Sequence, residues 1–333
     1  MTLPIGSIPQ IPFMTMSGGL RTEFGTITPP SGNVMAYVHS SGASRLTDIT
    51  AATTVPQVFL TLNAALNTCR SGYGDTVFVL PGHTENISSA DHMSNLKAGT
   101  RIIGLGLDTL RPTFTWTTAT STFLLDVADV WIENCIFNMD PGAGTVSVAA
   151  PITVSAAGCK LIGCRMRVST DANSKATIPI TTTAAGDDLA LVGCEIYGAT
   201  AGEVTTVIRA VGADRLKIIG TVIVAATSAV GIGVVQFITT ASTNILIDGN
   251  CVFRNNKALS TAAVTGLAGT TGFVNNTTLC TLGDSGGGVG QSLTMGHANG
   301  AWSANVDGMM FGANVSVVNL AGEVAAKATV VST

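Results

Sequence analysis

The chain has 333 residues, of which 46% are hydrophobic and 11% are charged, and its formal net charge at pH 7 is -4. A chain of this length can bury a large core. Its 16 Lys and Arg residues are scattered along the sequence, which argues against a nucleic-acid-binding protein, because that function needs a clustered basic face.

The cysteines and the first residues indicate a compartment. Seven cysteines are an odd number, and their spacing follows a repeat instead of forming pairs, so we expect reduced thiols. The segment Met1–Gly6 has neither the basic region nor the continuous apolar core of a secretory signal. We therefore expect synthesis and assembly in a cytoplasm.

Residues 1–50 do not share the repeat of the later chain and are predicted to form an extended anchoring arm. Prolines spaced among apolar residues favour an extended or polyproline-like backbone that cannot fold on itself. Such a segment needs a partner chain, and the alternative is a disordered tail. The residues expected to bind the partner are Leu3, Pro4, Ile5, Ile8, Pro9, Ile11, Pro12 and Phe13.

Residues 51–74 are predicted to form an amphipathic capping helix. Thr53 and Thr54 are N-cap candidates, Pro56 falls in the first turn, and apolar residues recur at helical spacing as far as Cys69. The open end of a solenoid has to be covered, and this helix is the predicted cover.

Residues 75–282 contain a repeat of about 30 residues, which decides the fold. The spacing from Cys135 to Cys164 is 29 residues, that from Cys164 to Cys194 is 30, and that from Cys194 to Cys251 is 57, with Thr221 standing between the last two. Each unit alternates with period 2 and is broken by Gly or Asn, which predicts a strand, a tight corner and another strand. Without crossover helices, such strands pair in parallel only by coiling. The sequence therefore predicts an all-β parallel solenoid.

The repeat also predicts which side chains point into the solenoid. Stacks of similar side chains are typical of such an interior, so we interpret the cysteines as small buried hydrophobic residues. For the same reason we expect the uncharged run from Ile218 to Ile247 to be buried solenoid and not a membrane span. One predicted inward column holds Cys135, Cys164, Cys194, Thr221 and Cys251, and the next holds Phe137, Met166, Ile196, Ile223 and Phe253.

From about Asp75 to Leu282 the chain resembles the right-handed parallel β-helix proteins of the pectate-lyase-like class, which include virion proteins and tailspikes of bacteriophages. The segment Gly74–Gly82 is similar to the first coil of that class. The resemblance implies an architecture and not an activity. It also favours a homotrimer, since phage β-helices commonly form trimers.

An outward apolar column supports assembly with other chains. Ile162, Val192 and Ile219 occupy the same outward position on three successive coils. Such a stripe indicates burial by another chain or by a long loop, and we interpret it as an oligomer interface.

Residues 283–333 are predicted to form a glycine-rich linker followed by short C-terminal strands. Gly283–Gly287 has the letters of the nucleophile motif of chymotrypsin-like proteases, but the upstream histidine motif is missing. The four histidines share no ligand spacing, so neither a metal nor a cofactor is expected. They are His39, His83, His92 and His297.

Glycoside cleavage by paired carboxylates is the enzymatic alternative. The candidates are Asp187, Asp188 and Asp214, with Asp129 further along the same corner. Equivalent positions one and two coils apart are separated by ~5 and ~9.6 Å, which brackets the distances used by retaining and inverting glycosidases. Corner aspartates, however, usually satisfy backbone amides, and few aromatic residues point outward. We therefore expect no enzymatic activity.

Three functional hypotheses follow. The leading one is a non-enzymatic virion structural protein of a bacteriophage, a capsid decoration or head-surface protein. Its arm would bind the major capsid protein or another virion protein. The others are a tailspike polysaccharide depolymerase and a non-catalytic receptor-binding adhesin. No nucleic-acid or membrane partner is expected.

Overall fold

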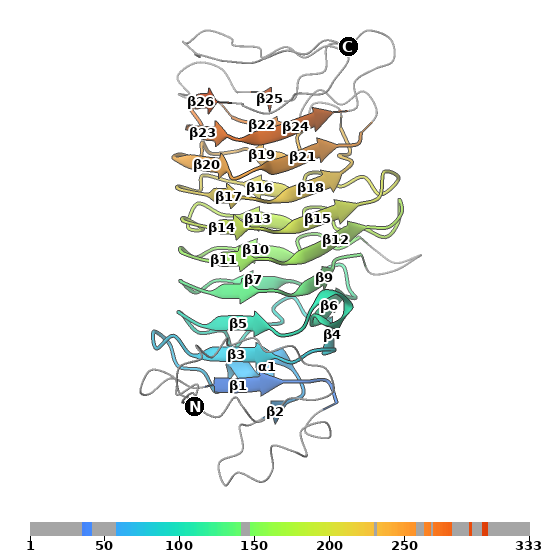
Figure 1. Cartoon of the computed structure of the whole chain (residues 1–333), viewed down its shortest axis with the longest axis vertical. Helices are drawn as coiled ribbons and strands as arrows, with labels where there is room; N and C mark the ends of the chain where they lie inside the picture. The colour runs from blue at the N-terminus through green and yellow to red at the C-terminus, as the bar shows by residue number, and fades with distance from the viewer. Residues whose placement is uncertain are drawn as a thin grey trace, which may run out of the picture.

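The computed structural model describes residues 35–41, 58–140, 147–229, 232–257, 263–267, 269–281, 293–294 and 302–305. The chain coils into a parallel β-solenoid whose strands stack into three sheets (Figure 1). One coil contributes a strand to each sheet in turn, for example β10 (Ile152–Val154), β11 (Lys160–Ile162) and β12 (Arg165–Ser169). The predicted all-β solenoid is confirmed.

The strands are short, and each pairs with the strand one coil away. Sheet A, with 11 strands, has the spatial order β2 (Val58–Phe59), β1 (Met35–Val38), β3 (Thr76–Val79), β5 (Arg101–Gly104), β8 (Trp131–Glu133), β11, β14 (Ala190–Val192), β17 (Lys217–Ile219), β20 (Ile245–Asp248), β23 (Gly272–Asn275) and β26 (Trp302–Asn305). Sheet B has eight strands, β4 (Thr84–Ile87), β6 (Thr113–Trp116), β9 (Ile136–Asn138), β12, β15 (Glu195–Gly198), β18 (Val222–Ala225), β21 (Cys251–Asn255) and β24 (Thr277–Thr281). Sheet C has seven, β7 (Phe123–Leu125), β10, β13 (Ile180–Thr182), β16 (Ile208–Ala210), β19 (Val235–Phe237), β22 (Val264–Thr265) and β25 (Leu293–Thr294).

The corner between sheets A and B explains why the repeat carries Gly or Asn at one fixed position. The residue there has a positive φ, a conformation that Gly and Asn adopt at the lowest cost. The corners are stacked by backbone hydrogen bonds from one coil to the next, such as Gly163 N to Val192 O at 2.8 Å. The positive-φ residues of this column are Asn134, Gly163, Gly193, Gly220, Gly249, Asn250 and Asn276.

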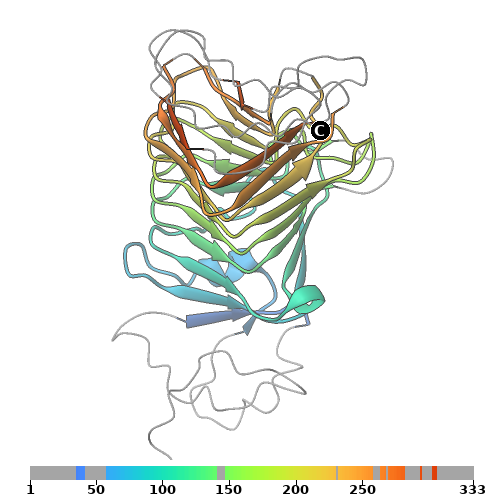
Figure 2. The ribbon, with the colours of Figure 1, turned by 45° about the horizontal axis from the view of Figure 1, so that its top comes forward.

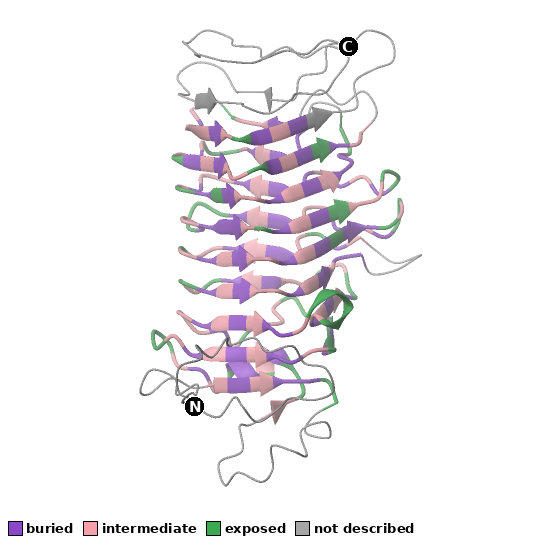
Figure 3. Ribbon diagram, in the orientation of Figure 1, coloured by how far each residue is buried: buried purple, intermediate pink, exposed green. Residues whose placement is uncertain are grey.

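The core is a continuous column of side chains between the three sheets. Figure 3 shows buried and partly exposed positions alternating along the strands, as period-2 strands require. Both predicted inward columns are fully buried, the one that contains Cys164 and the one that contains Met166. The six cysteines whose side chains are described are free and buried. Burial raises the pKa of Cys135 to about 12, which makes it an inert thiol.

The N-terminal end differs from the sequence prediction in two ways. The strand β1 pairs with β3 along its full length, so sheet A already begins at Met35, within the range expected for the arm. The helix α1 spans only Leu62–Leu66 and is capped by Thr61, while Val58–Phe59 forms β2 and pairs with β1. Pairing with an existing sheet outweighs the helical spacing of these residues. The predicted helix over 51–74 is therefore wrong in extent.

The helix α1 nevertheless lies at the N-terminal end of the core, as Figure 2 shows in light blue. It packs against β1, β2 and β3. Its residues Leu62, Ala65 and Leu66 are buried, which joins the helix to the main hydrophobic cluster.

The solenoid extends further toward the C-terminus than predicted. The strands β25 and β26 extend sheets C and A beyond residue 282. Gly283–Gly287 and His297 lie outside the described residues.

The uncharged run from Ile218 to Ile247 forms the strands β18 and β19 and parts of β17 and β20, as expected for buried solenoid. In the described part of the chain, no helix is both long and apolar enough to cross a membrane.

Candidate functional site

The three candidate acidic residues lie together at the corner that leads from sheet C into sheet A. Asp187 and Asp188 follow β13 on one coil, and Asp214 follows β16 on the next. The carboxylate of Asp187 accepts a hydrogen bond from the backbone amide of Asp214 at 2.7 Å. This is the backbone-satisfying role that corner aspartates commonly have.

An arginine connects the other two carboxylates. Arg215 donates from Nε and Nη2 to the two carboxylate oxygens of Asp188, at 2.9 and 2.7 Å, and its Nη1 contacts Asp214 Oδ2. Asp214 Oδ1 also accepts hydrogen bonds from Thr243 Oγ1 at 2.7 Å and from Asn244 Nδ2 at 2.8 Å. Three successive coils are thereby linked at this corner.

The electrostatics of this corner favour ionised carboxylates. The hydrogen bond from Arg215 lowers the pKa of Asp188, and those from Thr243 and Asn244 lower the pKa of Asp214. A glycosidase needs one carboxyl group with a raised pKa to protonate the leaving group. The pKa values of Asp188 and Asp214 are both lowered instead. The hydrogen bonds of both carboxylates join one coil to the next, which is a structural role.

The predicted interface residues form one straight row on the outer face of sheet A. Ile162, Val192 and Ile219 are in register on β11, β14 and β17, and each is only partly buried within the single chain. The next residues along the row are Glu133 on one side and Asp248 on the other. The row is therefore an apolar strip about three coils long with a carboxylate at each end.

A second row runs beside the first and carries cations. Arg101, Trp131 and Lys160 are in register on three adjacent coils. The guanidinium of Arg101 lies 4.4 Å from the centre of the Trp131 ring, and the Lys160 ammonium lies 3.9 Å from it. Because cations from both neighbouring coils contact this ring, Trp131 is not the open aromatic platform on which a sugar stacks. Tyr197 is 42% exposed, but it lies on β15 of sheet B and is not part of this row on sheet A.

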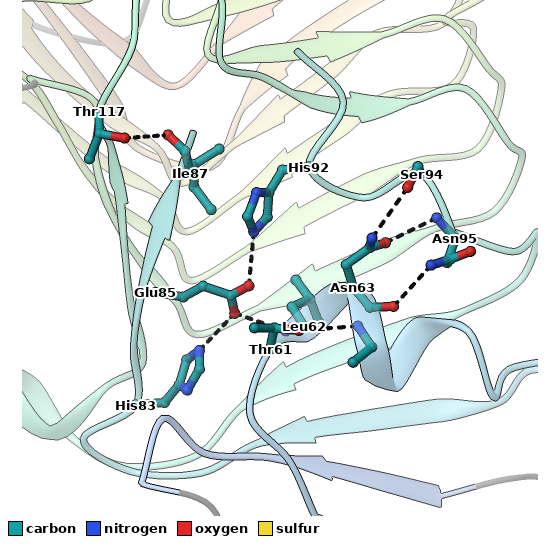
Figure 4. A network of polar contacts seen from close by, with 11 residues as sticks. Thr61, Leu62, Asn63, His83, Glu85, Ile87, His92, Ser94, Asn95 and Thr117 are labelled. Atoms are coloured by element: carbon teal, nitrogen blue, oxygen red, sulfur yellow. Dashed lines mark hydrogen bonds and ion pairs between the residues drawn. The ribbon is translucent and has the colours of Figure 1, made fainter. Parts of the chain in front are cut away.

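A polar cluster that the sequence reasoning missed lies at the N-terminal end of the core (Figure 4). The carboxylate of Glu85, which points inward from β4, is flanked by His83 Nε2 at 3.0 Å and His92 Nε2 at 2.8 Å. The backbone amide of Leu62, the first residue of α1, donates to the same carboxylate at 2.8 Å. Glu85 is 8% exposed and His83 is fully buried.

These contacts determine the charge state of the cluster. Burial acts to raise the pKa of Glu85, but the hydrogen bonds from His83, His92 and the Leu62 amide outweigh it and lower the pKa to about 2. An ionised carboxylate only accepts hydrogen bonds, so both Nε2 atoms carry a proton. Among the described residues, no group of three or more His, Cys, Asp or Glu side chains is arranged to hold a metal ion. The cluster joins α1 to β4 through the hydrogen bond from Leu62 to Glu85.

The partner-binding residues predicted for the N-terminal arm lie outside the described residues. They are Leu3, Pro4, Ile5, Ile8, Pro9, Ile11, Pro12 and Phe13.

Comparisons of the chain with protein-family models, curated proteins and solved structures each found no match.

Proposed function

We propose that this chain is a non-enzymatic virion structural protein of a bacteriophage, a capsid decoration or head-surface protein. It assembles as a homotrimer, and its N-terminal arm anchors it to the major capsid protein or to another virion protein. The phage assignment derives from the resemblance of the repeat to phage β-helix proteins.

The observation that carries the proposal is the partly exposed apolar row on the outer face of sheet A. Ile162, Val192 and Ile219 lie on a regular face of a rod of stacked coils, where water would otherwise contact them. A neighbouring rod of the same kind would bury this row along its whole length. Charged residues beside the apolar strip, such as Glu133 and Lys160, fit the polar rim of a protein interface.

The depolymerase alternative draws less support. Its candidate carboxylates Asp188 and Asp214 have lowered pKa values, and the outward Trp131 is flanked by cations. We expect the purified protein to release no sugar from host surface polysaccharides. Release of oligosaccharides that stops on Asp188→Asn would favour the depolymerase instead.

The test of the proposal has two parts. Light scattering on the purified chain should give a mass of three subunits, and cryo-electron microscopy of particles should place the rod on the virion surface. A monodisperse monomer contradicts the assembly through sheet A, and particles without the rod contradict the virion assignment.

A further inference from the structure

A second hydrophobic cluster lies outside the solenoid core, on the outer face of sheet A at its N-terminal end. Two of its members are buried and come from the corners that follow β3 and β5. Four partly buried side chains from the first strands of the sheet pack against them. We call this cluster the N-terminal patch; it consists of Leu80, Leu105, Tyr37, Val58, Phe78 and Ile103.

The N-terminal patch presents an aromatic pair and continues into exposed leucines. Tyr37 and Phe78 are in register on neighbouring strands, and their stacked rings have centroids 5.6 Å apart. Just beyond Leu105 the chain turns through the short 3-10 helix η4 (Asp108–Leu110). There Leu107 is 75% exposed and Leu110 is 56% exposed. A patch of this kind on a rod marks an interaction site.

The leucine-bearing turn is held in place by later coils. Asn134 Nδ2 donates to the carbonyl oxygens of Gly104 and Gly106 at 2.9 and 3.0 Å, and Arg111 Nη1 donates to the carbonyl of Gly163 at 3.1 Å. A surface that is already rigid loses little conformational freedom when a ligand binds. The turn that follows Leu105 of the N-terminal patch is therefore ordered before any ligand binds.

We infer that the N-terminal patch binds the proline-spaced segment Leu3–Phe13 of the same chain. The segment has no charged residue and carries apolar side chains between its prolines. Extended proline-rich segments dock on surfaces lined by aromatic residues, because their backbone is already ordered. The pairing of Tyr37 and Phe78 supplies such a surface.

The chain connectivity places this segment within reach. The residues that precede Met35 lead directly into β1, the strand that carries Tyr37 of the patch. Between Phe13 and Met35 the chain has 21 residues, which span as much as ~70 Å when extended. A tether of this kind gives an effective concentration on the order of millimolar, so a same-chain contact outcompetes a free partner of equal affinity.

The inference deepens the proposed function and rests on it only for the fate of the arm. In the free subunit the arm would lie on its own rod, and it would leave the patch when the binding site on the virion becomes available. The contact itself is a property of the isolated chain. It can therefore be measured without any particle.

The test is photo-crosslinking in the full-length chain, with a benzophenone amino acid in place of Leu107. We expect irradiation to link residue 107 to the segment 3–13 in a product of single-chain mass, identified by peptide mass spectrometry. The same amino acid in place of Tyr197, on sheet B, should give no such product. Absence of the link, or links that fall elsewhere in the chain, overturns the inference. Products of two-chain mass place a second copy on the patch and overturn it as well.

A matched pair of variants tests the chemistry of the contact. Ile8→Asp with Ile11→Asp puts two charges at apolar positions of the segment, and we expect the crosslink yield to fall about tenfold or more. Ser7→Asp with Gln10→Asp adds the same charge at neighbouring polar positions and should leave the yield unchanged. Equal yields from the two pairs contradict the inference. Loss of particle attachment is measured separately, so this contact and the anchoring function can fail independently.

Discussion

The backbone amide of Leu62 donates a 2.8 Å hydrogen bond to the carboxylate of Glu85, which is 23 residues further along the chain. The amide belongs to the first residue of α1, where no partner within the helix exists. The carboxylate belongs to the first strand of sheet B. This contact joins the helix at the end of the core to the wall of the solenoid, and the two histidines hold the carboxylate in position.

Acid should weaken the N-terminal end of the rod through Glu85. Its pKa is lowered to about 2 in the folded chain, against 4.5 for an ordinary Glu. The stabilisation from the ionised carboxylate is therefore complete above pH 4.5 and is lost as the pH falls from 4.5 through 2. Urea unfolding at a series of pH values should show this loss in the parent.

The variant Glu85→Gln should flatten that part of the pH profile and cost roughly 1–3 kcal/mol at pH 7, because charge-assisted hydrogen bonds are lost. Glu195→Gln, which removes a half-exposed partner of Arg165, serves as the control and should change stability by less than about 1 kcal/mol. A Glu85→Gln variant with the parental slope would show that this carboxylate is not responsible.

A charge in the inward column should unfold the rod. Cys164 is fully buried, so Cys164→Asp places an unpaired charge in the core. Cys164→Ala leaves only a small cavity and should cost about 1–2 kcal/mol. Thermal unfolding followed by circular dichroism compares the two, and an Asp variant that melts like the parent would contradict the inward assignment.

Two glycines, Gly193 at the corner between sheets A and B and Gly104 at the end of β5, should differ in their tolerance of alanine. Gly193 has a φ of 60° and open space around its Cα, so Gly193→Ala should cost about 1 kcal/mol of backbone strain. A Cβ at Gly104 would collide with the backbone oxygen of Asn134, so Gly104→Ala should cost about 3 kcal/mol. Denaturant unfolding measures both, and the reverse order would mean that the stacking of these corners is misplaced.

A lysine in the apolar row should weaken the proposed oligomer. Val192 lies in the middle of the row, so Val192→Lys would bury an unpaired charge in the proposed interface. We expect light scattering to show a shift toward monomer at the same protein concentration. Thr181→Lys, at an outward position on sheet C, is the matched control and should leave the mass unchanged. An unchanged mass for Val192→Lys would exclude this row as the interface.

Much of the fold follows from the sequence because the repeat is strict. Cys or Thr at one inward position and Gly or Asn at the corner before it recur on each coil from Cys135 to Cys251, and stacking requires that equal positions meet. The register of Ile162, Val192 and Ile219 could be predicted for the same reason. The ends of the solenoid could not, because β1 and β26 lack these markers and are defined by their pairing with β3 and β23.

The polar cluster around Glu85 could not be predicted from the spacing of its residues. Glu85 contacts His83 from its own strand, His92 from the following loop and Leu62 from α1, and no local pattern brings these together. The only local signal is a Glu at an inward position of β4, where a buried charge requires partners. The histidines are scattered in the sequence, whereas the fold brings His83 and His92 to one carboxylate.

The most direct test of the virion assignment is the occupancy of the rod on particles assembled with a chain that lacks residues 1–30. The deleted residues 1–30 precede every described strand, so the truncated rod should keep the parental melting transition, which circular dichroism verifies. Ordering such an arm costs roughly 1–2 kcal/mol per residue in backbone entropy, and an extensive contact with a partner is needed to offset that. We expect cryo-electron microscopy to find no truncated rod on the particles, whereas the full-length chain is present on them. Parental occupancy of the truncated chain would contradict anchoring by the arm.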